Sequence, residues 1–226
     1  FFNVLKIYFS GIIDWLFREF VFYICMIEFI VFLVHPMFAI DLRKILLKGD
    51  FNVFLFRPVN SFLQYFMVSS HFYAIYIGIA YFLLLLVFLE VFYPQFHLYK
   101  LVLSFIFSIF GRIMTFFIIA IFRTLAFFMK KSRELDKLYR RSEHIFQTYP
   151  ASFFSKGGFG ILILIFLITY YGAYSTEYFF GHIGLLKLLE LFSYMFGLTL
   201  LFTVTTCALW HLGVKRYEAF GYILIS

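Results

Sequence analysis

The chain has 226 residues, of which 64% are hydrophobic, 25% aromatic and only 14% charged, and its mean hydropathy is +0.94. Soluble domains carry about 25% charged and about 45–50% apolar residues, so this composition excludes a water-soluble domain and favours an integral membrane protein. The net charge of +7 could indicate nucleic acid as a partner, but the basic residues lie between the apolar runs. We therefore expect no nucleic-acid binding.

Five apolar runs are long enough to cross a membrane. A helix needs about 20 apolar residues to span hydrocarbon, and none of these runs shows the alternating polarity of a barrel strand. We expect an all-α polytopic helix bundle that forms a single transmembrane domain over residues 1–226. The predicted spans are 20–40, 65–89, 101–122, 159–174 and 188–209.

Lys and Arg are concentrated in alternate loops. The first loop (41–61), a long basic third loop (123–157) and the tail hold most of the 19 basic residues, whereas the second and fourth loops contribute only Lys100 and Lys187. Cytoplasmic loops carry the excess of Lys and Arg, so we expect the C-terminus in the cytoplasm. Five spans would then place Phe1 outside. Because the opening residues do not resemble a signal peptide, we expect a sixth span before the given start.

Residues that could support catalysis or hold a cofactor are not evident. The glycine-rich segment SKGGFGIL (155–162) lacks the Lys and Ser or Thr of a P-loop, so we do not expect this chain to hydrolyse ATP by itself. The His residues are scattered, and Cys25 and Cys207 lie in separate apolar runs without CxxC spacing. We predict no catalytic, cofactor-binding or metal-binding residues and no disulfide in this chain.

The charged side chains Glu28 and Arg112 fall inside the first and the third predicted span. Intramembrane charges are costly and face a bundle interior, a partner or a water-filled path. They could line a substrate route, form a structural ion pair or pair with a partner subunit. Counted from the outer ends of their runs, they differ by only about 5 Å in depth at 1.5 Å per residue. We predict that they approach one another.

The first loop carries signals for a short surface helix. Asp41 can cap it, because a carboxylate accepts hydrogen bonds from the free N–H groups of a first turn. Gly49 can end it, and Pro58 restrains Arg57 and marks a second break. Ile45 and Leu46 form an apolar face beside the basic residues Arg43, Lys44 and Lys48. The segment is either a positively charged, membrane-anchored loop or a docking element for a cytosolic partner.

Three segments carry a family resemblance. KGDFNVFLFRPVNSFLQYF (48–66), FQTYPASFF (146–154) followed by a span and STEYFFG (175–181), and WHLGVKRYEAFG (210–221) resemble, in order and spacing, a branch of the type-2 ABC (ATP-binding cassette) transporter permeases. The chain departs from the family pattern at Asn52, Thr176 and Ala219. The matching motif residues include Tyr149, Pro150, Gly181, Gly213, Tyr217 and Gly221.

The resemblance implies a type-2 ABC exporter permease fold with six transmembrane helices, in a bacterial cytoplasmic membrane. It also implies a second permease subunit, identical or related, and two cytosolic ATPase subunits that bind ATP and Mg. A coupling helix that docks on the ATPase would lie at about 41–56. The coupling residues would be Asp41, Arg43, Lys44, Gly49, Asp50, Arg57 and Pro58.

The third loop allows two interpretations. Residues 130–157 could form an amphipathic helix held at anionic lipid by charge, or they could act only as an orientation signal. For the whole chain, the alternative to an export permease is a structural hydrophobic subunit of a respiratory or photosynthetic complex. A membrane-embedded lipid-modifying enzyme would need a His, Asp or Glu cluster, which the sequence lacks.

Overall fold

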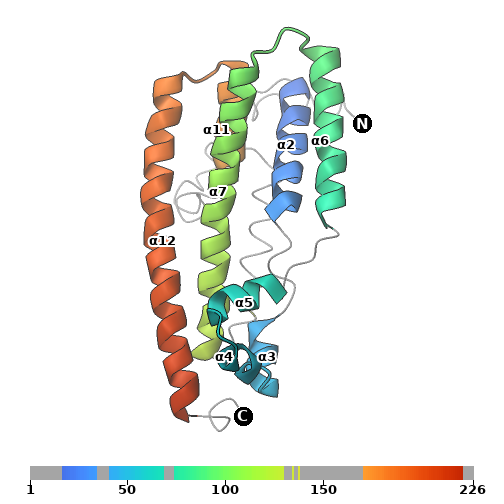
Figure 1. Ribbon diagram of the computed structural model, residues 1–226. Helices are drawn as coiled ribbons and strands as arrows, with labels where there is room; N and C mark the ends of the chain where they lie inside the picture. Colours follow the sequence, from blue (N-terminus) through green and yellow to red (C-terminus); the bar gives the residue numbers. More distant parts are fainter. Residues whose placement is uncertain are drawn as a thin grey trace.

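The computed structural model describes residues 17–34, 41–68, 74–129, 134, 137 and 170–220, and its regular elements within these ranges are all helices. Five long helices form an elongated bundle (Figure 1). They are α2 (Phe17–Val34), α6 (Ala74–Phe92), α7 (Leu98–Thr124), α11 (Tyr170–Phe180) and α12 (Leu185–Phe220).

Short helices gather at one end of the bundle, which we call the basal end (bottom of Figure 1). They are α3 (Leu42–Lys48), α4 (Asn52–Phe56), α5 (Ser61–Val68) and the 3₁₀ turn η2 (Leu125–Phe127). The turns that join α6 to α7 and α11 to α12 lie at the opposite, apical end. Among the long helices that the structure describes, only α7 and α12 extend to the basal end, whereas α2 and α6 occupy the apical part (Figure 1).

Three described helices are long and apolar enough to cross a membrane, over Ile75–Phe92, Leu98–Phe127 and Leu185–Tyr217. They correspond to the second, third and fifth predicted spans. Helix α2 has 18 residues and covers most of the first predicted span. Residues 159–169 of the fourth predicted span lie outside the described part of the chain.

The second predicted span, 65–89, is divided in the structure. Tyr65 and Phe66 belong to α5 rather than to α6, and both are buried at the basal end. Asn60 starts α5, because its side-chain oxygen accepts hydrogen bonds from the N–H groups of Phe62 at 2.9 Å and Leu63 at 3.4 Å. Hydropathy could not locate this break, because the part of α5 inside the predicted span, Tyr-Phe-Met-Val at 65–68, is apolar throughout.

Other helices continue past the predicted ends of their spans. Helix α7 reaches Thr124 and runs on into η2, α11 reaches Phe180, and α12 extends to Phe220, through most of the predicted tail. Between α11 and α12, Gly181 has a φ of 84°, which fits the turn expected there. Hydropathy marks where a helix leaves the apolar layer, and a helix continues until a breaker or cap ends it.

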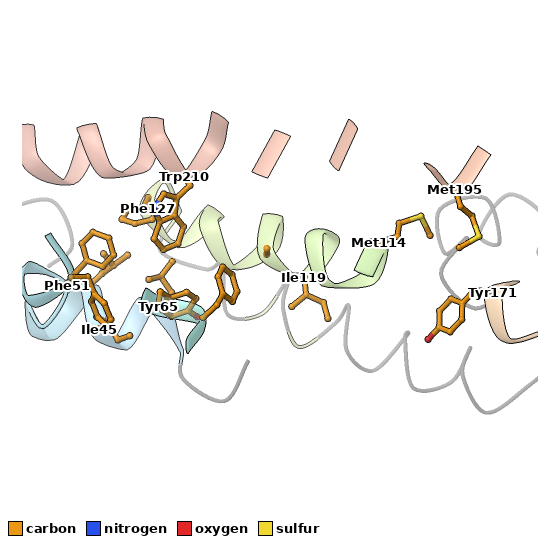
Figure 2. Packing of buried hydrophobic residues seen from close by; sticks show 14 of the residues in the cluster. Ile45, Phe51, Tyr65, Met114, Ile119, Phe127, Tyr171, Met195 and Trp210 are labelled. Carbon is orange, nitrogen blue, oxygen red and sulfur yellow. The ribbon is translucent and has the colours of Figure 1, made fainter. Parts of the chain in front are cut away.

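Two packed regions organise the bundle. At the apical end, α2 packs against α6, and the Phe22 ring stacks on Phe179 of α11 with centroids 4.4 Å apart. The larger core cluster joins α3, α4 and α5 to α7, η2 and α12. Figure 2 shows Phe51, Tyr65 and Phe127 near Trp210, with Met114, Met195 and Tyr171 farther along the bundle.

Candidate functional site at the basal end

Helix α3 begins and ends as the sequence predicts. The Asp41 side chain accepts a hydrogen bond from the Arg43 N–H at 3.1 Å. At the other end Gly49 adopts the left-handed conformation with a φ of 76°, and its N–H donates to the Leu46 carbonyl at 3.2 Å. Because other L-residues adopt this backbone only at an energetic cost, Gly49 has a conformational role. It turns the chain so that Phe51 enters the core.

Helix α3 is amphipathic and packs on the bundle through its apolar face. Leu42, Ile45 and Leu46 are buried against α7 and η2, whereas Lys44 and Lys48 are exposed and Arg43 is half-buried. The apolar face therefore holds the segment on the bundle, and the basic side chains remain in contact with solvent.

The second predicted break is also present. Arg57 is extended, with φ −85° and ψ 142°, and it precedes Pro58. The buried Gln64 side chain fastens this turn, because its Nε2 donates to the Phe54 carbonyl at 3.2 Å and to the Val59 carbonyl at 2.5 Å. The turn is thereby tied to α5.

This fastened segment presents an exposed apolar tip, defined here by Val53, Phe56 and Val59. Phe56 is 86% exposed, Val53 50% and Val59 53%. Asp50 and Arg57 flank the tip and are exposed as well. A cluster of exposed apolar side chains with a polar rim is typical of a contact surface.

Beneath the tip, Phe51 is fully buried in an aromatic cluster. Its ring lies 5.2 Å from Tyr217, 5.3 Å from Phe127 and 5.9 Å from Trp210 (Figure 2). The loop, the end of α7 and α12 therefore meet at one residue.

The closing sequence motif explains the α12 side of this cluster. Gly213 and Tyr217 follow Trp210 by three and seven residues, which places all three on one helical face. A Cβ at Gly213 would lie 2.5 Å from the Phe127 ring, so glycine is needed for η2 to approach α12. The motif is a packing face, and its spacing is the signal that could have identified Trp210.

Trp210 makes a further contact that the sequence pattern does not indicate. Its Nε1 donates to the Ser61 hydroxyl at 3.1 Å, and its ring lies 5.2 Å from Phe62 and 5.7 Å from Tyr65. Trp210 is only 6% exposed, and its part-buried hydrogen bond joins α12 to the first residue of α5.

Farther along the bundle, α7 and α11 meet in a polar seam. The Ser104 hydroxyl donates to the Ser175 carbonyl at 2.9 Å, and the Ser108 hydroxyl donates to the Ser175 hydroxyl at 3.0 Å. Arg112, which is 3% exposed, lies one turn further along α7. The spacing 104, 108, 112 places these side chains on one face, so polar residues at every fourth position are the sequence signal for this seam.

The seam is closely packed. A Cβ at Gly111 would lie 2.3 Å from the Tyr171 side chain, and one at Gly172 would lie 2.4 Å from Ile27 of α2. Because Gly111 precedes Arg112 and Ile27 precedes Glu28, these contacts bring the two charged residues to a similar level along the bundle. The pairing of Glu28 with Arg112 stays a prediction.

At the apical end, Glu19 Oε1 and His182 Nε2 lie 3.0 Å apart, and Glu19 is buried. This contact joins the start of α2 to the turn after α11. Nearby, burial raises the pKa of Glu177, with His182 acting in the opposite direction.

Several predicted residues lie outside the described part of the chain: Tyr149, Pro150 and Gly221, with most of the loop 123–157. Among the residues that are described, no group of three or more His, Cys, Asp or Glu side chains could hold a metal ion.

Comparison with known proteins identifies the family. The family model described as "ABC-2 family transporter protein" matches residues 1–221, which is nearly the whole chain. No curated protein and no solved structure matches. With its apolar helical bundle, this chain belongs to the ABC-2 transporter family and is an integral membrane permease component of an ABC transporter.

Proposed function

We propose that this chain is one of two permease subunits, identical or related, of an ATP-driven exporter in a bacterial cytoplasmic membrane. Two cytosolic ATPase subunits would bind ATP and Mg and drive transport. The segment 41–61, which we call the coupling segment, would dock on one of them. The observation that carries this proposal is the exposed tip, where Phe56 is 86% exposed above a fully buried Phe51.

The construction of the coupling segment suits docking. A surface that transmits force needs exposed contact groups on a firm support. The tip supplies the contact groups, while the Asp41 and Gly49 caps and the Gln64 bonds supply the support. A free loop would have to lose conformational entropy on binding, and this ordered segment has already lost it.

Charge supports a cytoplasmic basal end. Exposed Lys44, Lys48 and Arg57 lie in the coupling segment, and exposed Lys215 and Arg216 lie on the last turns of α12. By the positive-inside rule this end faces the cytoplasm, with the C-terminus on the same side. The basic stretch 130–157 would then follow the end of α7 on the cytoplasmic side, at anionic lipid.

The docking proposal is tested by replacing Phe56 with Ser in a tagged chain and measuring which ATPase subunits co-purify. Phe92→Ser is the matched control, because Phe92 is 56% exposed on α6 at the apical end. We expect Phe56→Ser to lower the recovery of the ATPase and Phe92→Ser to leave it unchanged. Equal recovery from both variants would contradict docking at the tip.

Reconstitution tests the dependence on partners. The chain alone, the chain with its second permease subunit, and both with the ATPase are placed in liposomes, and the efflux of a fluorescent hydrophobic dye is followed with ATP hydrolysis. Only the complete assembly should show ATP-dependent efflux. Efflux driven by a proton gradient from the isolated chain would favour a secondary transporter. Respiratory subunits co-purifying in place of an ATPase would favour the structural alternative.

A further inference from the structure

The coupling segment packs mainly against long helices other than α6, the long helix that follows it in the chain after α5. Within the described residues α6 packs mainly on α2, and its buried residues Leu85, Phe88 and Leu89 belong to the apical cluster. The buried residues of the coupling segment belong to the cluster of α7, η2 and α12. Sequence order therefore connects the segment to α6, whereas packing connects it to α7 and α12.

Trp210 is the residue at which these connections meet. It contacts the coupling segment through Phe51 at 5.9 Å and η2 through Phe127 at 5.5 Å. Its Nε1 also donates a hydrogen bond to the Ser61 hydroxyl of α5 at 3.1 Å. Gly213, one turn further along α12, keeps η2 against the same face.

Gln64 closes the connection from the docking tip to Trp210. The tip residue Val59 and the α4 residue Phe54 are both held by the Gln64 amide, and Gln64 lies one turn after Ser61 on α5. A displacement of the tip must therefore move α5 and the Trp210 ring together, unless one of these hydrogen bonds breaks.

We propose that Trp210 is a positioning residue that transmits movement of the coupling segment to α12 and the end of α7, and not to α6. This inference rests on the proposed function. We call the hydrogen bond between Trp210 and Ser61, together with the surrounding rings, the joint. The hydrogen bond fixes the orientation of α5 on α12, and the rings prevent α5 from sliding along α12. During the transport cycle the coupling segment and the basal half of α12 move as one body.

The functional test uses the complex that co-purifies with a tagged chain, reconstituted in liposomes. Trp210→Phe keeps an aromatic ring and removes the N–H, and Ser61→Ala removes the acceptor. Ser193→Ala is the matched control, because its hydroxyl bonds locally to the Glu190 carbonyl on the exposed face of α12. We expect dye efflux per ATP hydrolysed to fall at least about fivefold in both joint variants, the lower range of measured couplings. Ser193→Ala should keep the wild-type ratio.

A distance measurement separates transmission from simple support. In a Cys207→Ala background, spin labels are placed at Leu47 on α3 and Leu212 on α12, or at Leu47 and Tyr76 on α6, all of which are exposed. With MgATP and vanadate, we expect the first distance to stay constant and the second to change. In Trp210→Phe the first distance should change as well.

The outcomes distinguish failure of this inference from failure of the proposed function. A Leu47–Leu212 distance that changes in the otherwise unmodified chain would overturn the inference, as would a wild-type ratio of efflux to hydrolysis in both joint variants. Failure of any ATPase to co-purify with the unmodified chain would instead overturn the proposed function, and the inference with it.

Discussion

The polar seam allows a quantitative prediction with an internal control. At Gly111 a Cβ would lie 2.3 Å from both Cβ and Cγ of Tyr171, whereas at Gly197 on α12 nothing lies within 4 Å. Both glycines are inside long helices. The same Gly→Ala substitution therefore introduces a methyl group into a closed helix interface at one site and into open space at the other.

The expected magnitudes have opposite signs. Overpacking a close interface costs about 1–3 kcal/mol, and here the obstacle includes the Cβ of Tyr171, which cannot swing away. At Gly197 the substitution should be neutral or stabilising by up to about 1 kcal/mol, from the higher helix propensity of Ala. With about 2–4 °C per kcal/mol for chains of this size, Gly111→Ala should lower the melting temperature by several degrees.

The assay is thermal unfolding of the purified protein in detergent, followed by fluorescence and by the monodisperse fraction after heating. Gly111→Ala should melt below the wild type, and Gly197→Ala should melt at or slightly above it. If the two variants shift the melting temperature equally, the close approach of α7 and α11 is not what requires glycine at position 111. The structural interpretation of the seam would then fail.

Three further predictions concern other contacts. If Glu28 and Arg112 pair, the charge-swapped double mutant should recover more stability in detergent than the sum of the single mutants allows; additive losses would indicate separate partners. Burial raises the pKa of Glu177, so the folded state holds the proton of this carboxyl group more tightly than the unfolded chain does. The folded state therefore loses stability as the pH rises from the unfolded pKa through the folded pKa. Glu177→Gln should therefore raise the melting temperature at about pH 7 and lose this advantage at about pH 4; equal melting temperatures at the higher pH would refute this. Gln64→Leu leaves two carbonyls without their donor, a cost of about 1–3 kcal/mol, and should accelerate chymotryptic cleavage after Phe56, which is 86% exposed; an unchanged cleavage rate would show that the amide does not hold the turn.

Local chemistry explains what could be predicted about the coupling segment. A carboxylate caps a helix within its own first turn, and a glycine ends one within its last turn, so Asp41 and Gly49 could be interpreted from their neighbours alone. The proline break after Arg57 is local in the same way. All three features are present in the structure at the predicted residues.

Contacts between distant residues could not be derived in this way. Ser61 and Trp210 are 149 residues apart, and Glu19 and His182 are 163 apart. The same limit affected the division of the span 65–89, because whether an apolar helix lies in lipid or against α12 depends on what packs beside it. The spacings of Trp210, Gly213 and Tyr217, and of Ser104, Ser108 and Arg112, contained local traces of these tertiary contacts.

The sequence by itself determined that this protein is a helical membrane bundle with a capped, basic segment between spans, because length, hydropathy, charge and capping act over short stretches of chain. The tertiary structure decided which helices touch. Lipid accepts an apolar helix in any rotation, so hydropathy does not reveal the buried face, and close packing with interhelical hydrogen bonds selects it instead. That selection attaches the coupling segment to α12 through Trp210 and closes the seam around Gly111.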